Sequence, residues 1–164
     1  MKNELMIRSA TIQDVPLILS FIKELAEYEK LSHEVVATED ILQKTLFGPK
    51  SHAEVILGYY ENTPVAFALF FHNFSTFLGK PGIYLEDLFV KKEMRGKGFG
   101  QQVLAYLAKL AKERDCGRLE WWVLDWNTPA IEFYKRIGAI PMDEWTVFRV
   151  TGDALDNLAN LSIA

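Results

Sequence analysis

Cysteine and histidine are scarce in this chain of 164 residues, which contains one cysteine and three histidines. The lone cysteine, Cys116, excludes a disulfide framework and is typical of a reducing compartment, so we expect a cytoplasmic protein. The histidines His33, His52 and His72 are scattered and lack the spacing of metal ligands. We therefore expect no metal site.

Long apolar runs and an excess of positive charge are also missing. The longest apolar run, residues 64–71, is far shorter than the roughly 20 residues that span a bilayer, and the first residues show no apolar signal segment. The formal net charge is −4, whereas a nucleic-acid-binding protein needs a basic face. We expect no membrane and no nucleic acid partner, and one globular domain over residues 1–164.

The hydrophobic pattern switches between the periods of helices and strands along the chain. It predicts strands at residues 4–8, 53–60, 65–72, 83–90, 119–124 and 145–150. It predicts helices after Thr11, after Thr38 and after the glycines at 96–100, and further helices at 128–137 and 153–161. A capping box is expected at Thr11–Asp14 and a hairpin turn at residues 61–64.

This order, β-α-α-β-β-β-α-β-α-β, is typical of a mixed α/β fold in which helices flank one twisted sheet. An antiparallel meander in the middle of the chain makes that sheet mainly antiparallel. A doubly wound sheet of the flavodoxin type would need helices between the middle strands. The spacing between residues 53 and 90 leaves no room for them.

A basic loop with glycines at 96, 98 and 100 follows the strand expected at 83–90. Such glycines let main-chain N–H groups approach an anion at a helix N-terminus. A Walker A loop needs Ser or Thr after its Gly-Lys, but Gly98 follows Lys97. A dinucleotide fingerprint needs a third glycine where this chain has Gln101 or Val103. We therefore expect a phosphorylated ligand of another class.

The loop Arg95–Gly100, R-G-K-G-F-G, resembles the acetyl-CoA loop of the GNAT superfamily of N-acetyltransferases. Four more blocks resemble the spermidine/spermine N-acetyltransferase family, which includes thialysine acetyltransferases: Ile22–Glu29, Tyr84–Asp87, Trp126-Asn127 and Phe133–Ala139. The resemblance implies a GNAT-like fold and an enzyme that transfers acetyl from acetyl-CoA to a primary amine. The substrate would be a small cationic polyamine, diamine or thialysine-like molecule, and the protein a homodimer.

The same resemblance implies a set of cofactor-binding residues. They are Leu88, Phe89, Val90, Arg95, Gly96, Lys97, Gly98, Phe99, Gly100, Asn127 and Tyr134. Tyr134 matches the family's general acid, which protonates the departing thiolate at the start of the second CoA-facing helix. Taken alone, Tyr134 would be read as a core aromatic and Asn127 as a helix N-cap.

An acidic pair, Glu86 and Asp87, lies inside an apolar strand, where a charge is costly unless it is paired or functional. The family pattern makes Glu86 the catalytic proton acceptor of the amine site, directly or through water, and Asp87 a substrate contact. Because strand neighbours alternate, at most one should face a given pocket. The resemblance adds Tyr28, Glu29 and Phe77 as substrate-binding residues. Phe77 stands where animal members carry a tryptophan, so an aromatic wall is kept but its size changes.

Two other functions stay open at this stage. One is a peptide or protein N-acetyltransferase, although the acidic strand suits a compact cation better than an extended chain. The other is a CoA-binding sensor without catalysis, which the intact Tyr134 and glycine loop disfavour. Aromatic residues late in the chain suit either the core or a dimer interface: Trp121, Trp122, Trp145 and Phe148.

Overall fold

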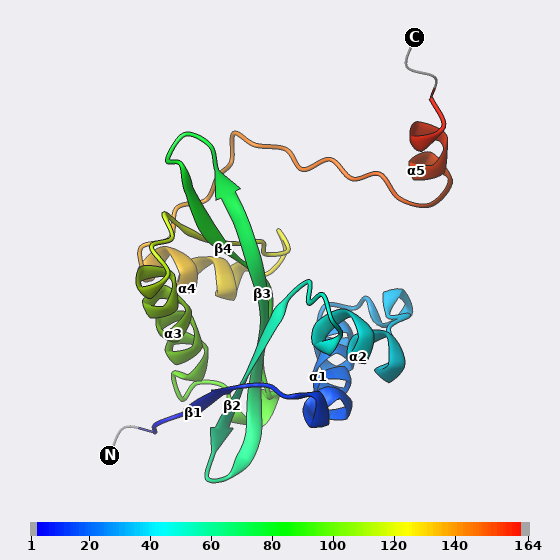
Figure 1. The fold of residues 1–164 in the computed structure, drawn as a ribbon. Coiled ribbons are helices and arrows are strands. Elements are labelled where there is room, and N and C mark those ends of the chain that lie inside the picture. Colours follow the sequence, from blue (N-terminus) through cyan, green and yellow to red (C-terminus); the bar gives the residue numbers. More distant parts are fainter. Residues whose placement is uncertain (1–2, 162–164) are drawn as a thin grey trace. The chain divides into compact units, whose positions relative to one another are not determined.

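The computed structural model describes residues 3–161 (Figure 1). The chain divides into two compact units, Met1–Leu124 and Asp125–Ala164, and each is described by itself. The single domain expected over residues 1–164 stays a prediction.

One five-stranded sheet forms the centre of the first unit, with the strand order β1-β2-β3-β4-β5. The strands are β1 (Met6–Ser9), β2 (Glu54–Tyr60), β3 (Thr63–Ser75), β4 (Lys80–Val90) and β5 (Leu119–Trp121). Neighbours are antiparallel from β1 to β4, and β5 is parallel to β4. The mixed, mainly antiparallel sheet is the fold class that the sequence predicts.

The β2–β3 hairpin is tighter than expected. Its turn consists of Glu61 and Asn62, both with positive φ (48° and 64°), which is the backbone of a type I′ turn. Pro64, expected in the turn, belongs to β3 and pairs with Tyr59.

Helices cover both faces of this sheet (Figure 1). Helices α1 (Val15–Tyr28) and α2 (Glu39–Phe47) lie on one face, and α3 (Phe99–Glu113) lies on the other. Short 3-10 turns occupy Ile12–Asp14, Ser32–Glu34 and Lys92–Met94. The predicted capping box is present before α1, since the Asp14 carboxylate accepts a hydrogen bond from the Thr11 N–H at 2.7 Å.

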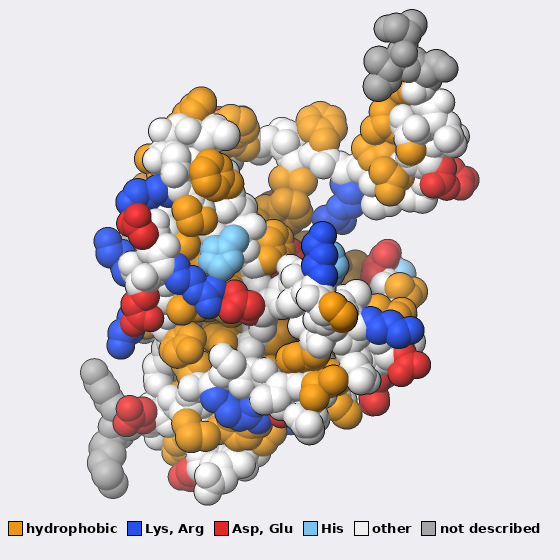
Figure 2. Space-filling model, viewed as in Figure 1, with side chains coloured by type: hydrophobic (Ala, Val, Ile, Leu, Met, Phe, Trp, Pro, Cys, Tyr) orange, Lys and Arg blue, Asp and Glu red, His pale blue; other side chains and the backbone are white. Residues whose placement is uncertain are grey.

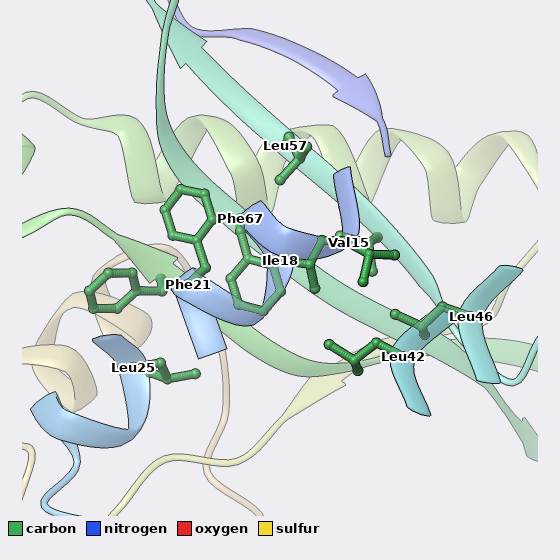
Figure 3. Close-up of a cluster of buried hydrophobic side chains, with 10 residues drawn as sticks. Val15, Ile18, Phe21, Leu25, Leu42, Leu46, Leu57 and Phe67 are labelled. Atoms are coloured by element: carbon green, nitrogen blue, oxygen red, sulfur yellow. The ribbon is translucent and has the colours of Figure 1, made fainter. Parts of the chain in front are cut away.

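The main core lies between α1, α2 and the sheet (Figure 3). Ile18 and Phe21 of α1 are fully buried, and the Phe21 ring stacks on Phe67 of β3 at 5.6 Å. Phe89 of β4 meets Phe21 edge-on at 6.3 Å. This packing fixes the end of β4 beneath α1, which places the acidic pair near the end of that helix.

The second unit contains α4 (Thr128–Arg136) and α5 (Gly152–Ala159). The strand expected at residues 145–150 was wrong, because none of these described residues forms a strand. A strand exists only through hydrogen bonds to a neighbour, and alternation alone does not supply one. Likewise, β5 ends at Trp121, three residues before the expected end at Leu124.

The second unit buries little. None of its described residues, 125–161, is buried, and Trp145 and Phe148 are 76% and 91% exposed. Along α5 the exposed apolar side chains include Leu155 and Leu158 (Figure 2). Over residues 3–161, no helix is both long enough and apolar enough to cross a membrane.

Candidate active site

The glycine loop opens directly into α3. Gly96 and Gly98 have φ values of 79° and 82°, a left-handed conformation that favours glycine, and Gly98 is the N-cap of the helix. A Cβ placed on Gly96, Gly98 or Gly100 would meet no protein atom within 4 Å. Gly100 has neither a positive φ nor a close neighbour, so protein packing does not require a glycine there. The open space leaves main-chain N–H groups accessible to a ligand at the helix N-terminus.

The strand that leads into this loop also has an accessible edge. Strand β4 pairs with β5 only over Ile83–Leu85. Within the described part of the first unit, no further strand pairs with that edge over residues 86–90. This stretch contains Leu88 and Val90, whose main chains the family pattern assigns to the cofactor.

A β-bulge lies at the acidic pair. Leu69 of β3 is opposite Asp87, and the next residue, Phe70, is opposite Leu85, so Glu86 is the extra residue. Cross-strand partners share a face of the sheet. Because Leu69 packs against the core under α1, Asp87 lies on that face as well.

The bulge interrupts the strict alternation on which the one-carboxylate expectation rests, and that expectation stays a prediction. Burial, followed by the charges of Glu86 and Glu29, raises the pKa of Asp87 to about 7. Burial and the charge of Glu86 also raise the pKa of Glu29. The charge of Glu86 thus acts on both Asp87 and Glu29, and we call these three residues the acidic cluster.

The termination of α1 brings Glu29 and Tyr28 to this cluster. The Leu31 N–H donates to the Ala26 carbonyl at 2.8 Å, and the Lys30 N–H donates to the Glu27 carbonyl at 3.1 Å. Lys30 has a φ of 62°. These bonds form a Schellman motif, which ends the helix at a fixed residue.

Phe77 lies elsewhere in the first unit. It sits in the β3–β4 turn and is fully exposed. Lys80 begins β4 and Asp87 is seven residues further along, a distance of about 23 Å for a strand. The structure does not bring Phe77 together with the acidic cluster, so its contact with substrate stays a prediction.

Two expected site residues belong to the second unit. Asn127 is the N-cap residue of α4, but its side chain makes no capping hydrogen bond. Tyr134 lies near the end of α4, rather than at its start as expected, with its ring 5.6 Å from that of Phe133. Their roles toward a cofactor stay predictions.

One contact of the loop could not be anticipated from the sequence. Arg95 extends from the glycine loop to the end of α1, where its guanidinium lies over the ring of Tyr28. No local pattern predicts this contact, because the two residues are far apart in the chain. Among residues 3–161, no three His, Cys, Asp or Glu side chains gather in a way that could hold a metal ion.

The fold and the open glycine loop at a helix N-terminus have the features of a class of proteins that bind phosphorylated ligands. Comparison with known proteins identifies the class. A model of the acetyltransferase (GNAT) family matches residues 20–139, and the chain belongs to this family. It is an acetyltransferase, as the sequence predicts.

Individual relatives agree with this assignment. The chain is 38% identical to the thialysine N-epsilon-acetyltransferase of Bos taurus, over 94% of this chain and 96% of that protein. It is 35% identical to the L-ornithine N5-acetyltransferase of Arabidopsis thaliana, over 96% of this chain and 89% of that protein. A solved integron cassette protein from V. cholerae has a TM-score of 0.80 and 30% identity, with 98% of this chain and 99% of that chain covered.

Proposed function

We propose that this chain transfers an acetyl group from acetyl-CoA to the terminal amine of a small cationic substrate, a diamine, polyamine or thialysine-like amino acid. The acidic cluster of Glu29, Glu86 and Asp87 is the observation that carries the proposal. Neighbouring carboxylates repel one another, and a substrate cation relieves that repulsion. The GNAT family generally uses acetyl-CoA, which supports the choice of donor.

The residues have separate roles in this proposal. The N–H groups of residues 95–100 hold the pyrophosphate of acetyl-CoA, and the main chain of Leu88 and Val90 holds its pantetheine and acetyl portion. An alkylammonium has a pKa of about 10.4, so the amine must lose a proton before it attacks the thioester carbonyl. Glu86 takes this proton, directly or through water. Tyr134 gives a proton to the departing thiolate.

The substrate preference follows from the cluster and from the relatives. Glu29 and Asp87 attract the ammonium group, which favours substrates with concentrated positive charge. Thialysine and ornithine, named for two relatives, carry a terminal amine on an amino acid. A peptide or protein substrate is the alternative. The non-catalytic sensor is set aside, because the chain belongs to an acetyltransferase family.

We also propose that two copies of the chain form a homodimer. The exposed apolar side chains of residues 140–161 support this, because large apolar surfaces are typical of protein interfaces. The cytoplasmic location expected from the lone Cys116 stays a prediction.

The proposed activity is tested by thiol release from acetyl-CoA with purified protein. The panel contains ornithine, thialysine, lysine, putrescine, spermidine, spermine and a lysine-containing peptide. Turnover with a small amine is the expected result. Two results would contradict the small-amine assignment. One is binding of acetyl-CoA without turnover of any compound in the panel, and the other is turnover of the peptide alone.

Two variants test the catalytic roles. Glu86→Gln and Tyr134→Phe should each lower kcat by about 100-fold or more, because a general base or acid contributes that much. Matched controls are Glu93→Gln, on an exposed residue before the loop, and Tyr106→Phe, on the half-buried tyrosine of α3. Both controls should stay close to wild type. Equal activity of Glu86→Gln and Glu93→Gln would rule out Glu86 as the base.

A further inference from the structure

Arg95 contacts two elements: strand β4, which leads into the glycine loop, and the end of helix α1. Its guanidinium carbon lies 4.4 Å from the ring centre of Tyr28 and 5.4 Å from that of Phe89. Its Nε donates a hydrogen bond to the Val90 carbonyl oxygen at 3.1 Å. Arg95 therefore spans from the expected cofactor loop to a residue expected in the amine site.

We propose that Arg95 is a positioning residue that holds the Tyr28 ring and so couples the amine site to the acetyl-CoA site. The inference rests on the proposed function for the identity of the two ligands. The contact itself, between a cation and the face of an aromatic ring, is independent of that function.

On the side of β4, Arg95 contacts residues that are held in place by the core. Phe89 is only 6% exposed and is held edge-on by Phe21 in the core under α1. The hydrogen bond to Val90 fixes the guanidinium from the strand side. Tyr28 is the last residue of α1 and is 39% exposed, and Arg95 covers one face of its ring.

The ring of Tyr28 matters because of its neighbour. Glu29 follows it directly and belongs to the acidic cluster through the charge of Glu86. The Schellman hydrogen bonds fix the backbone of the turn that carries both residues, so the contact with Arg95 acts on the Tyr28 side chain. The loss of this contact should therefore weaken the binding of the amine, although Arg95 lies in the cofactor loop.

One arginine can serve both sites at once. The guanidinium carbon lies over the Tyr28 ring and Nε bonds to Val90, while the remaining N–H groups of an arginine are donors suited to an anion. A pyrophosphate on those donors would fix Arg95 and, through it, Tyr28. Acetyl-CoA or CoA should therefore tighten amine binding, and the amine should tighten CoA binding by the same factor.

A double-mutant cycle tests this coupling. Arg95→Lys keeps the positive charge for the cofactor but removes the planar contact, and Tyr28→Leu removes the ring. Each should raise the dissociation constant of the amine, measured by calorimetry in the presence of CoA. For Arg95→Lys the expected rise is about two- to five-fold. Arg95→Lys added to Tyr28→Leu should cause no further rise, because both remove one contact.

Lys97→Ala is the matched control, since Lys97 is an exposed cation of the same loop. Lys97→Ala should weaken CoA binding. Any change that it causes in the dissociation constant of the amine should be the same with and without Tyr28→Leu. The coupling is overturned if Arg95→Lys leaves amine affinity unchanged, or if its effect adds in full to that of Tyr28→Leu.

A readout without substrates separates this inference from the proposed function. The Nε–H proton of Arg95 should show an upfield NMR shift from the Tyr28 ring current. Tyr28→Phe should keep this shift, and Tyr28→Leu should reduce it to the smaller contribution of the Phe89 ring. A shift of undiminished size in Tyr28→Leu would overturn the contact. If the wild type acetylates no amine but the shift behaves as stated, the proposed function fails while the contact stands.

Discussion

Asp87 is a carboxyl group whose pKa of about 7 lies close to neutral pH. In the folded protein it holds its proton from about pH 4 to pH 7, where the unfolded chain has already released it. A raised carboxyl pKa therefore stabilises the fold at low pH, and this contribution is lost as the pH rises through 7.

Asp87→Asn removes this titration. The variant should gain stability relative to wild type between pH 5 and pH 8, by an amount on the order of a few kcal/mol at most. Urea unfolding at several pH values measures the difference. Asp143→Asn, on an exposed residue, is the control and should show no such trend. A constant difference between Asp87→Asn and wild type from pH 5 to pH 8 would contradict the raised pKa.

The sequence identifies the acidic pair but not its geometry. A charge inside an apolar strand singles out Glu86 and Asp87 without any structure. Their relation depends on the bulge, which is a property of the register between β3 and β4. No local pattern in β4 encodes that register. The coupling of both residues to Glu29 therefore becomes visible only when α1 is packed over the sheet.

Helices and hairpins were predicted well where the signal is local. The caps at Thr11 and Thr38 mark the helix starts, and periodicity places β2, β3 and β4. The strand expected at residues 145–150 had the right alternation but no partner. The reason is physical. The hydrogen bonds of a helix cap form between residues a few positions apart, whereas the hydrogen bonds of a strand require a second segment of the chain.

Two glycines at helix ends should respond in opposite ways to alanine. Gly138 has a φ of 93° and ends α4, with the Ala139 N–H donating to the Tyr134 carbonyl at 3.0 Å. Gly138→Ala should destabilise the protein by about 1 kcal/mol, because the left-handed conformation is strained for alanine. Thermal unfolding measures this loss, and acetyl-CoA affinity should stay unchanged.

Gly100→Ala is the counterpart in the first turn of α3. Its backbone is unstrained and its Cβ meets no protein atom, so alanine should raise stability by about 0.5–1 kcal/mol. The proposed close approach of the pyrophosphate predicts a weaker affinity for acetyl-CoA in the same variant. An unchanged affinity would show that the ligand does not approach Gly100.

The assembly of the whole molecule is the part that the sequence determines least. Trp145 and Phe148 suit a core and an interface equally well as residue types. Within the second unit itself, both side chains are exposed. Exposed apolar side chains on this unit become favourable when a surface covers them, at about 25 cal/mol per Å² of apolar area buried.

The proposed homodimer predicts that Trp145→Ser combined with Phe148→Ser weakens self-association at least about tenfold, because aromatic residues contribute much of the binding energy of interfaces. Sedimentation velocity over a range of protein concentrations measures the dissociation constant. Val36→Ser, on a side chain that is 83% exposed in the first unit, is the control and should leave it unchanged. A wild-type protein that stays monomeric at all concentrations would refute the dimer. A double variant that dimerises as strongly as wild type would place the interface away from these residues.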